Sequence, residues 1–439
     1  MEYYSSQVLK FFRRIAPEIE FVRYCKTNNV EVFTTEVVSY KSLGVLSDNP
    51  TFLESMESSL ISFFAESGPF NGKRYERVKF RYFDICCQVF EKTLDILEKE
   101  KSITTVYVPN GRMADQKTFV IASTHQNPAI KIIYFEKGYL DNFYYVGENS
   151  LLDRVEMQSA IRQSNYYPLL SLASAFFDSR RVDERVNEYI AGWKDDAIEE
   201  DIQLSTKRVT FFNSSNDEFM SLGTGWNDSE WISQWAAFDE IAHYLLKNDY
   251  DITLRMHPNG ANKSRRERSR ERLELDAFRN KFPTIIVFEP QEKVNSYNLI
   301  KQSDLIVVWN STIGLEACYM GKPVVCLNSS EWDLSIPNFR ARHGSDLQNL
   351  IQVIPKANPD DALKYIAGRI SLDKPLRSND IRSIYLNLEK NDFVYRLARI
   401  SAGSRKFRFR NIFKIFFSSN STALYKYLKR LSAKFQGNW

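Results

Sequence analysis

Lys301–Asn328, KQSDLIVVWNSTIGLEACYMGKPVVCLN, is the stretch that decides the fold. A short apolar run rich in β-branched residues is followed by small polar residues, an apolar helical segment closed by Gly-Lys-Pro, and a second apolar run. This order predicts a strand at Leu305–Trp309, a helix at Ile313–Met320 and a strand at Val324–Leu327. Such a βαβ unit belongs to a parallel sheet and directs the beginning of its helix at the carboxyl edge of that sheet.

The residues at the start of this predicted helix favour an anionic ligand. Asn310, Ser311 and Thr312 are residues that cap helices, and Gly314 permits a close approach of the backbone. Free N–H groups and small hydroxyls suit a phosphate better than a metal ion. Glu316 lies one turn further on, where two explanations stay open: a favourable interaction with the helix dipole, or hydrogen bonds to the hydroxyls of a ribose.

The rest of the chain repeats the alternation of strands and helices in two halves, and its 439 residues are too many for one typical core. We therefore expect an α/β fold with two Rossmann-like domains that face a cleft. The expected parts are an N-terminal domain over 1–195, a second domain over 196–375, a helix over 376–400 that packs back across the domains, and a tail over 401–439. Strands are expected at 29–35, 104–108, 130–135, 208–212, 250–256 and 285–288, and helices at 52–66, 78–101, 230–246, 296–302 and 359–370.

The cysteines argue for a reducing compartment. There are five, with no C-x-x-C pair, and Cys318 and Cys326 lie in the apolar βαβ unit, where they are expected to be buried as small hydrophobic residues. The scatter and odd count do not fit a disulfide framework. The N-terminus has no uninterrupted apolar region of the signal-peptide kind, and no apolar run is long enough to span a membrane. We expect a cytoplasmic protein.

The tail at 401–439 has a composition of its own. It carries nine Lys or Arg residues and no Asp or Glu, although the net charge of the whole chain is only +4. Apolar residues recur in it at helical spacing, which predicts a basic amphipathic segment that binds an anionic membrane surface. The alternative is a helix packed on the protein with a solvated basic face. A nucleic-acid partner is not expected, because the basic excess is confined to the tail and no binding motif accompanies it.

His257 stands at the end of a predicted strand in the sequence Arg255-Met256-His257-Pro258. The proline fixes a turn, so the imidazole should lie at the carboxyl edge of the sheet, where a ring nitrogen can bond a phosphate oxygen. A histidine in such a turn can also be purely structural. The expected position of His257 on the same edge as Ser311 favours the functional interpretation.

Two carboxylates are expected in polar loops after strands, one in each half of the chain. Glu136 follows the strand at 130–135, and Asp217 follows the strand at 208–212, with Glu218 as its competitor. Paired carboxylates across a cleft can act as acid, base or nucleophile at a sugar carbon, although either one can be an ordinary loop residue. Asn110 and Arg112 form a turn after the strand at 104–108 and should share an edge with Glu136.

No metal or cofactor site is expected. Asp249-Tyr250-Asp251 matches the D-x-D pattern of metal-dependent sugar transferases, but it precedes a strand and is interpreted as a turn at the edge opposite His257. No set of His, Cys or carboxylates has metal-ligand spacing. The chain also lacks a P-loop, a G-x-S-x-G and a G-x-G-x-x-G sequence.

The motifs resemble those of a known group of enzymes. RMHPNG at Arg255–Gly260 and SDLIVVWNSTIGLEACYMGKPVV at Ser303–Val325 resemble the donor-binding half of GT-B glycosyltransferases, most of all bacterial capsule and lipopolysaccharide biosynthesis proteins such as the capsule-type transferases of Kdo (3-deoxy-manno-octulosonic acid). NGR at 110–112, FEKG at 135–138 and FFNSSNDEF at 211–219 look like further elements of these proteins. The pattern is specific for the GT-B group and its epimerase relatives, not for a particular sugar.

The resemblance implies a role for each candidate residue. The phosphate of a nucleotide-sugar would be bound by His257 and Ser311-Thr312, and its ribose by Glu316. Glu136 and Asp217 match, loosely, carboxylates that serve catalysis in retaining Kdo transferases. The remaining residues expected at the donor site are Arg255, Asn310 and Gly314, and those expected on the acceptor side are Asn110 and Arg112.

These implications describe a metal-independent glycosyltransferase of surface polysaccharide synthesis. It would move a sugar from a CMP-Kdo-like or UDP-sugar donor to a lipid-linked acceptor, held at the inner face of the plasma membrane by residues 401–439. The alternatives are a UDP-sugar 2-epimerase of the same fold and an inactive GT-B-like scaffold of capsule assembly. The spacing of Glu136 and Asp217 does not distinguish inversion from retention.

Overall fold

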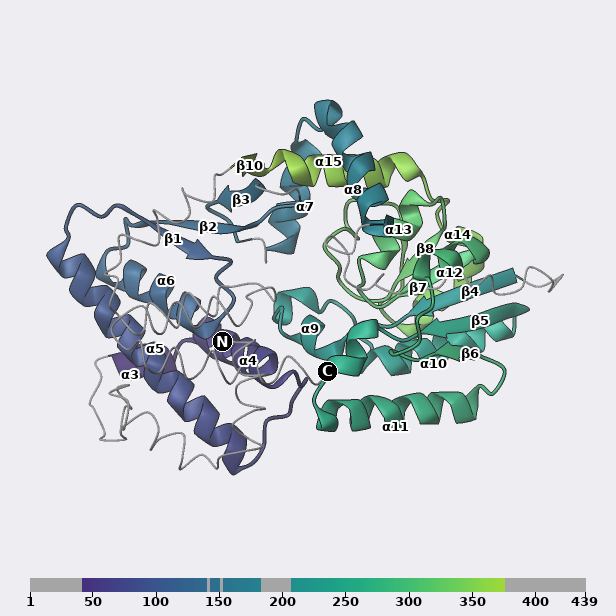
Figure 1. The fold of residues 1–439 in the computed structure, drawn as a ribbon, viewed down its shortest axis with the longest axis horizontal. Coiled ribbons are helices and arrows are strands. Elements are labelled where there is room, and N and C mark those ends of the chain that lie inside the picture. Colours follow the sequence, from purple (N-terminus) through teal and green to yellow (C-terminus); the bar gives the residue numbers. More distant parts are fainter. Residues whose placement is uncertain (1–41, 140–142, 151–152, 183–206, 376–439) are drawn as a thin grey trace, which may run out of the picture. The chain divides into compact units, whose positions relative to one another are not determined.

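The computed structural model describes residues 42–139, 143–150, 153–182 and 207–375. Over these ranges the chain is an α/β structure with two sheets, one of strand order β1-β2-β3-β10 and one of order β6-β5-β4-β7-β8-β9 (Figure 1). The predicted α/β class is confirmed. The predicted strand at 29–35, the helix at 376–400, the tail and the boundary near residue 195 lie outside the described residues.

The four-stranded sheet is mixed, which corrects the prediction of a parallel first sheet. Its strands are β1 (Thr105–Pro109), β2 (Lys131–Lys137), β3 (Phe143–Gly147) and β10 (Asp373–Pro375). β1 and β2 are parallel, whereas β3 is antiparallel to both β2 and β10. The link from β2 to β3 is too short for a parallel crossover, so the chain turns back as a hairpin.

Helices precede and separate the strands of this sheet. They are α3 (Ser42–Ser47), α4 (Pro50–Phe64), α5 (Lys73–Lys99) and α6 (Ala114–Gln126). Asn49 caps α4, because its side chain accepts a hydrogen bond from the Phe52 N–H and Pro50 occupies the first helical position. Leu97, Val106 and Ile130 form a buried cluster that joins α5 to the sheet.

The six-stranded sheet is entirely parallel, as the βαβ pattern predicts. Its strands are β4 (Lys207–Phe212), β5 (Tyr250–Arg255), β6 (Ile286–Phe288), β7 (Leu305–Val308), β8 (Val324–Cys326) and β9 (Phe339–Arg340). The chain runs outward from β4 to β6 on one side, and from β7 to β9 on the other. The sheet therefore has a topological switch point between β4 and β7, where ligands of open α/β sheets bind.

Helices cover both faces of this sheet. They are α7 (Arg154–Gln163), α8 (Leu170–Val182), α9 (Asn216–Met220), α10 (Gln234–Leu246), α11 (Arg265–Lys281), α12 (Ser296–Gln302), α13 (Ile313–Tyr319), α14 (Leu350–Val353) and α15 (Pro359–Ser371), with 3₁₀ turns η2 (Tyr167–Leu169), η4 (Thr224–Trp226), η5 (Pro258–Asn262) and η6 (Gly344–Asn349). α10 and α11 lie on one face and α13 on the other (Figure 1).

Successive residues of a strand point to opposite faces of the six-stranded sheet, so each strand contributes side chains to the hydrophobic cluster on either face. Phe211 packs with the residues of α10 and α11, while its neighbour Phe212 packs with those of α12, α13 and α15. Val307 and Val308 divide between the same two clusters. A strand buried on both faces must be apolar throughout, which is why the sequence of β7 reads as an unbroken hydrophobic run.

One predicted helix is too long at its beginning. The helix expected at 230–246 starts at Gln234, because the Ser233 hydroxyl caps it by accepting from the Ala236 N–H at 3.1 Å. Ile232, inside the predicted range, precedes the observed helix and is 93% exposed. The other predicted helices and strands of the described ranges agree with the structure to within five residues, and the largest difference is the start of α5 at Lys73 instead of residue 78. In these ranges no helix has both the length and the hydropathy of a membrane span.

Candidate functional site

The loops that leave the carboxyl ends of β4 and β5 are joined to each other. Asn213, directly after β4, accepts a short hydrogen bond through its side chain from the backbone N–H of His257, which follows β5. Beyond Asn213 the chain forms α9, a short helix that carries Asp217 and Glu218. Both carboxylates were expected in a loop, and the helix corrects this detail. Both carboxylates lie close enough to His257 to act on its charge, a proximity that was not predicted from the sequence.

Asp217 forms a buried ion pair. Lys263 Nζ lies 2.6 Å from Asp217 Oδ1 and 2.7 Å from Oδ2, and both side chains are almost inaccessible to water. The Ser215 hydroxyl donates a further hydrogen bond to Oδ1 at 2.7 Å. Both oxygens of Asp217 are therefore occupied by partners within the protein.

Glu218 has a different environment from its neighbour. Its side chain is 36% exposed and lies 3.8 Å from Lys263 Nζ, a looser contact than that of Asp217. Glu218 Oε1 accepts a short hydrogen bond from the Asn259 side chain. Of the two adjacent carboxylates, Glu218 is the one that a ligand can reach.

His257 is half-buried at the start of η5, and the structure indicates its tautomer. Nδ1 accepts a hydrogen bond from the Asn259 N–H at 3.2 Å, so in the neutral ring the proton is carried by Nε2. Burial lowers the pKa of His257, and although Glu218 opposes this, Lys263 adds to it. The imidazole is thus held neutral near pH 7, with a donor nitrogen at the sheet edge.

Glu271, on α11, is a further carboxyl group close to the Asp217–Lys263 pair. It is buried, and burial, with the nearby Glu267 and Asp217, raises its pKa to about 7, while Lys263 acts in the opposite direction. It packs against η5, since a Cβ added at Gly260 would lie 3.2 Å from Glu271 Oε2. A second ionisable carboxyl therefore adjoins the Asp217–Lys263 pair.

The loop after β7 keeps polar side chains at the start of α13. Ser311 Oγ accepts from the Ile313 N–H at 3.3 Å, and Thr312 occupies the capping position without a capping bond from its side chain. Asn310 is half-buried and Thr312 is exposed. The predicted polar cluster is present, but its capping is weaker than its composition suggests.

The side chain that lies close against the backbone of Gly314 is Trp332, a residue of the protein itself. A Cβ on Gly314 would lie 2.4 Å from Trp332 Cζ2, so only glycine leaves room for the indole. Trp332 is fully buried and its Nε1 donates to the Ser311 carbonyl at 3.3 Å. Gly314 and Trp332 together fix the beginning of α13.

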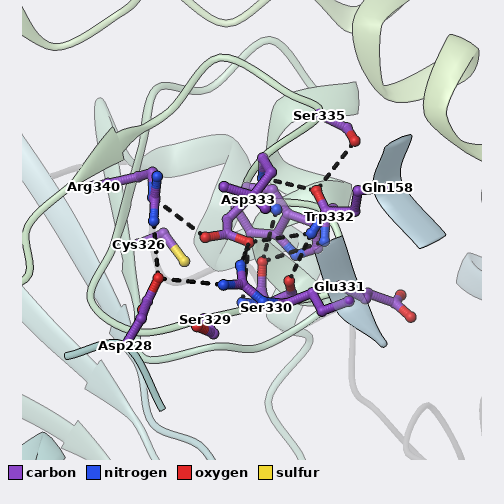
Figure 2. A network of polar contacts seen from close by, with 12 residues as sticks. Gln158, Asp228, Cys326, Ser329, Ser330, Glu331, Trp332, Asp333, Ser335 and Arg340 are labelled. Carbon is purple, nitrogen blue, oxygen red and sulfur yellow. Dashed lines mark hydrogen bonds and ion pairs between the residues drawn. The ribbon is translucent and has the colours of Figure 1, made fainter. Parts of the chain in front are cut away.

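An ion network holds the loop that carries Trp332. Asp333 and Asp228 face three guanidinium groups: Asp333 lies 2.7 Å from both Arg154 and Arg342, and Asp228 lies 2.9 Å from Arg340 (Figure 2). Burial alone would raise the pKa of Asp228, but Arg342 and its neighbours hold it below its usual value. The network joins the loop after β8 to α7, and its members were not anticipated from the sequence.

Glu316, expected to bind ribose, is already bound within the protein. Arg180 Nε of α8 lies 2.9 Å from Glu316 Oε1, and the Tyr297 hydroxyl donates a short hydrogen bond to Oε2. Glu316 is buried. A ribose could reach this carboxylate only by displacing one of these partners.

Arg255 is also engaged. Its side chain is buried, and its Nη1 and Nη2 donate to the carbonyl oxygens of Glu289 and Glu292 at 2.6 and 2.8 Å. Burial lowers the pKa of Arg255 to about 10. These bonds tie the end of β5 to the loop after β6, so the contribution of Arg255 to the edge is mainly structural.

Glu136, Asn110 and Arg112 come together in the four-stranded sheet, as expected. Glu136 lies within β2, opposite Tyr145, rather than in a loop after it, because β2 extends to Lys137 to pair with β3. Burial raises the pKa of Glu136, whereas the Arg112 charge and a hydrogen bond with Asn110 lower it, and Glu331 raises it. Gly111 completes the turn with φ +78°, where a Cβ would meet the Tyr134 ring at 2.6 Å.

Possible metal ligands are the next group of residues to consider. The described residues contain no cluster of three or more His, Cys, Asp or Glu side chains placed to hold a metal ion. Asp249 has φ +59° and ends the turn before β5, which agrees with its interpretation as a turn residue. Cys318 and Cys326 are buried, as predicted, and burial raises the pKa of each to about 12.

One known family matches the middle part of the chain. Residues 185–335 match the model of the family described as capsule polysaccharide biosynthesis protein. This segment is similar to that family. It includes β4 to β8 and every candidate residue of the six-stranded sheet, and it confirms the resemblance predicted from the motifs. No curated protein matches the sequence.

Several solved structures resemble this chain. Thermosulfurimonas dismutans KpsC, a beta Kdo 2,4 transferase, is 12% identical over 62% of this chain and 80% of its own, with a TM-score of 0.39. S. aureus MnaA in a co-structure with UDP is 16% identical over 71% and 83%, with a TM-score of 0.29. The UDP-GlcNAc 2-epimerase of Neisseria meningitidis, bound to UDP-GlcNAc, is 13% identical over 70% and 82%, with a TM-score of 0.30. At these values the resemblances carry no conclusion about the reaction.

Proposed function

We propose that this protein is a GT-B-type glycosyltransferase of capsule synthesis, which moves a sugar from a nucleotide-sugar to a growing surface polysaccharide. The observation that carries the proposal is the convergence of Glu218 and His257 at the carboxyl edge of β4 and β5, inside the segment that matches capsule biosynthesis proteins. A neutral imidazole beside a reachable carboxylate, next to the switch point of a parallel sheet, suits a phosphate-linked sugar.

The donor phosphate would be held without a metal ion. His257 Nε2 would donate to one phosphate oxygen, because Nδ1 already accepts from Asn259. The hydroxyls of Ser311 and Thr312, with the side chain of Asn310, would complete the site from the loop after β7. These preorganised donors would stabilise the negative charge that develops on the nucleotide as it leaves.

The carboxylates would take part in the reaction at the anomeric carbon of the sugar. In the transfer the bond from the anomeric carbon to the donor phosphate oxygen breaks, a bond to an acceptor hydroxyl forms, and a carboxylate takes the hydroxyl proton. Glu218 fits this edge better than Asp217, whose oxygens are both bound by Lys263. Glu136, with Asn110 and Arg112, is proposed as the acceptor-side group.

The acceptor would be lipid-linked, and the enzyme peripheral on the inner face of the plasma membrane. The support for this is compositional: residues 401–439 carry nine basic and no acidic side chains. Such a segment would keep the enzyme beside a substrate that cannot leave the bilayer.

The test compares carboxylate variants in one transfer assay, in which nucleotide release from the donor is measured with membranes that supply the acceptor. Glu136→Ala and Glu218→Ala should each abolish release and preserve donor binding in a thermal-shift assay. Glu274→Ala, an exposed carboxylate on α11, is the control and should behave as the wild type. Full activity in both Glu136→Ala and Glu218→Ala contradicts the assignment.

A UDP-sugar 2-epimerase is the second candidate, because the motif pattern is shared with that group. An epimerase acts on free UDP-sugar and has no need of a membrane. Epimerised UDP-sugar formed without membranes or acceptor would favour it over the transferase. Nucleotide release that requires acceptor membranes would exclude it. The third candidate, an inactive scaffold, predicts no nucleotide binding at all.

A further inference from the structure

We propose that the N-terminal turns of α5 and α11 form one basic surface that docks the folded protein on an anionic lipid membrane. The surface, called here the α5–α11 surface, consists of Lys73, Arg74, Arg77, Lys79, Phe80 and Arg81 of α5 and Arg265, Arg266, Arg268, Arg272 and Leu273 of α11. The proposal does not depend on the sugar-transfer reaction or on residues 401–439.

The two helix starts are in direct contact. Arg266 Nη1 donates to the Tyr75 hydroxyl at 2.8 Å, and its guanidinium lies 5.5 Å from the Tyr75 ring centroid. The Tyr75 hydroxyl in turn donates to Glu66 at 2.7 Å. Segments 191 positions apart in the chain therefore present their first turns together.

A second set of bonds holds the same junction. Glu267 of α11 accepts hydrogen bonds from Ser67, from the backbone N–H at 3.2 Å and from the hydroxyl at 2.6 Å. Arg270 Nη1 donates to the same hydroxyl at 2.8 Å. The acidic residues of this part of α11 are turned inward, since Glu267 and Glu271 are both buried.

What remains outside is strongly positive. The nine basic residues of the α5–α11 surface are all exposed, and Glu76 and Glu274 are the exposed carboxylates within or next to the same stretches. The charge of one of the nine, Arg272, is matched by ion pairs with Asp276 at 2.9 Å and Glu289 at 2.8 Å. On α5 the spacing of Lys73, Arg77 and Arg81 at four-residue intervals places them on the side opposite the buried Tyr75 and Tyr82. Attraction to acidic headgroups adds up over such a set.

Two apolar side chains favour a bilayer over a soluble polyanion. Phe80 is 61% exposed and Leu273 is 73% exposed, and each lies among the exposed cations of its helix. An aromatic and an aliphatic side chain can enter the interface between headgroups and acyl chains, which adds apolar burial to the electrostatic attraction. A nucleic acid or a charged glycan would gain nothing from Leu273.

The test uses the full-length protein with vesicles of equimolar phosphatidylglycerol and phosphatidylcholine, and with vesicles of phosphatidylcholine alone. The triple variant Lys73→Gln, Lys79→Gln, Arg265→Gln removes three exposed charges. Within the described residues none of these side chains forms a hydrogen bond or an ion pair, so we expect the variant to fold. Since each basic residue near an anionic surface contributes about fivefold to partitioning, we expect the three substitutions together to lower partitioning by about a hundredfold. The control triple, Lys101→Gln, Lys247→Gln and Lys301→Gln, removes three exposed charges elsewhere and should change partitioning by less than about twofold.

A position-specific readout separates this surface from the tail. A nitroxide placed by Leu273→Cys, with Cys25→Ser as background, should lose accessibility to a water-soluble relaxation agent when anionic vesicles are added. The proposal is overturned if the two triple variants lose vesicle partitioning to the same extent. It is also overturned if the nitroxide remains accessible to the water-soluble agent while the protein is bound to vesicles. A surface triple variant that loses binding to dextran sulfate but keeps binding to vesicles would overturn it as well, because the surface would then serve a soluble polyanion.

Discussion

Arg112 Nη1 donates two hydrogen bonds to Ser221, one to the hydroxyl and one to the carbonyl oxygen at 3.3 Å. Arg112 belongs to the turn after β1, and Ser221 ends α9, the helix that carries Asp217 and Glu218. The same guanidinium lowers the pKa of Glu136, which burial raises. One cation thus relates the candidate carboxylate of the four-stranded sheet to the helix that bears the candidates of the six-stranded sheet.

The first prediction concerns this charge. If Glu136 acts as a base, activity is lost as pH falls through its pKa. Arg112→Gln removes an attraction that favours the ionised carboxylate, so the pKa of Glu136 should rise and the acid limb of the pH–rate profile should move to higher pH. Ser221→Ala is the control: it removes the hydroxyl acceptor but keeps the charge, so its acid limb should stay in place. If the acid limb of the pH–rate profile stays at the same pH in Arg112→Gln, Glu136 is not the catalytic base.

The second prediction is a pH-dependent gain of stability in Glu271→Gln. The pKa of Glu271 is about 7 in the fold, against 4.5 for an unperturbed glutamate. Between these values the native state holds a proton that the unfolded state has lost, so this group's contribution to stability falls as pH rises from 4.5 to 7. Glutamine does not titrate, so in Glu271→Gln this loss of stability with rising pH is absent. At about pH 8 the free energy of unfolding of the variant should exceed that of the wild type by up to about 3 kcal/mol.

Urea unfolding at about pH 4.5 and pH 8 measures this difference. Glu274→Gln, on the exposed side of the same helix, should show no pH-dependent gain. A gain in Glu271→Gln that is the same at both pH values would mean that the carboxyl does not titrate in this window.

The third prediction concerns the packing at the start of α13. Gly314→Ala would place a methyl group 2.4 Å from Trp332 Cζ2, and the fully buried indole has little space to move. Overpacking of this kind costs about 1–3 kcal/mol of unfolding free energy. Gly44→Ala is the matched control, because nothing lies within 4 Å of the added carbon in α3. Thermal or urea unfolding should separate the two variants, and Trp332→Phe should restore part of the loss in Gly314→Ala.

The fourth prediction tests whether Glu316 meets a nucleotide. Tyr297→Phe removes a hydroxyl that donates to Glu316 Oε2, a bond that a bound ribose would have to replace. Nucleotide affinity should therefore increase in Tyr297→Phe, by about tenfold for one hydrogen bond to a charged group, and should decrease in Glu316→Gln. Titration calorimetry with the nucleotide compares the variants with the wild type. If the nucleotide affinity is unchanged in both variants, Glu316 does not contact the nucleotide and its role is the ion pair with Arg180.

Much of the six-stranded sheet could be predicted because its signal is local. β7 is an unbroken apolar run, and the Gly-Lys-Pro after α13 ends the helix within a residue of the expected place. The edge positions of His257 and Ser311 followed from the rule that polar loops leave parallel strands at one side. These inferences need only neighbouring residues.

What could not be predicted depends on residues far apart in the chain. Asp217 and Lys263 are 46 positions apart, and nothing in either local sequence marks the pair. Glu316 and Arg180 are separated by 136 positions, so an expected ligand-binding carboxylate proved to have a partner in α8. The hairpin that makes β3 antiparallel was missed because the short Gly-containing link after β2 was interpreted as a polar loop and not as a turn.

The measurement that tests the account most directly is a thermal-shift screen of the full-length protein against CMP, CDP, UDP, GDP and their sugars, with and without Mg²⁺. We expect one nucleotide family to stabilise the protein equally in both conditions, by about 2.7 kcal/mol at a hundred times its Kd, and His257→Ala to remove the shift. Absence of a shift with every nucleotide, or a shift that requires Mg²⁺ and persists in His257→Ala, would contradict it.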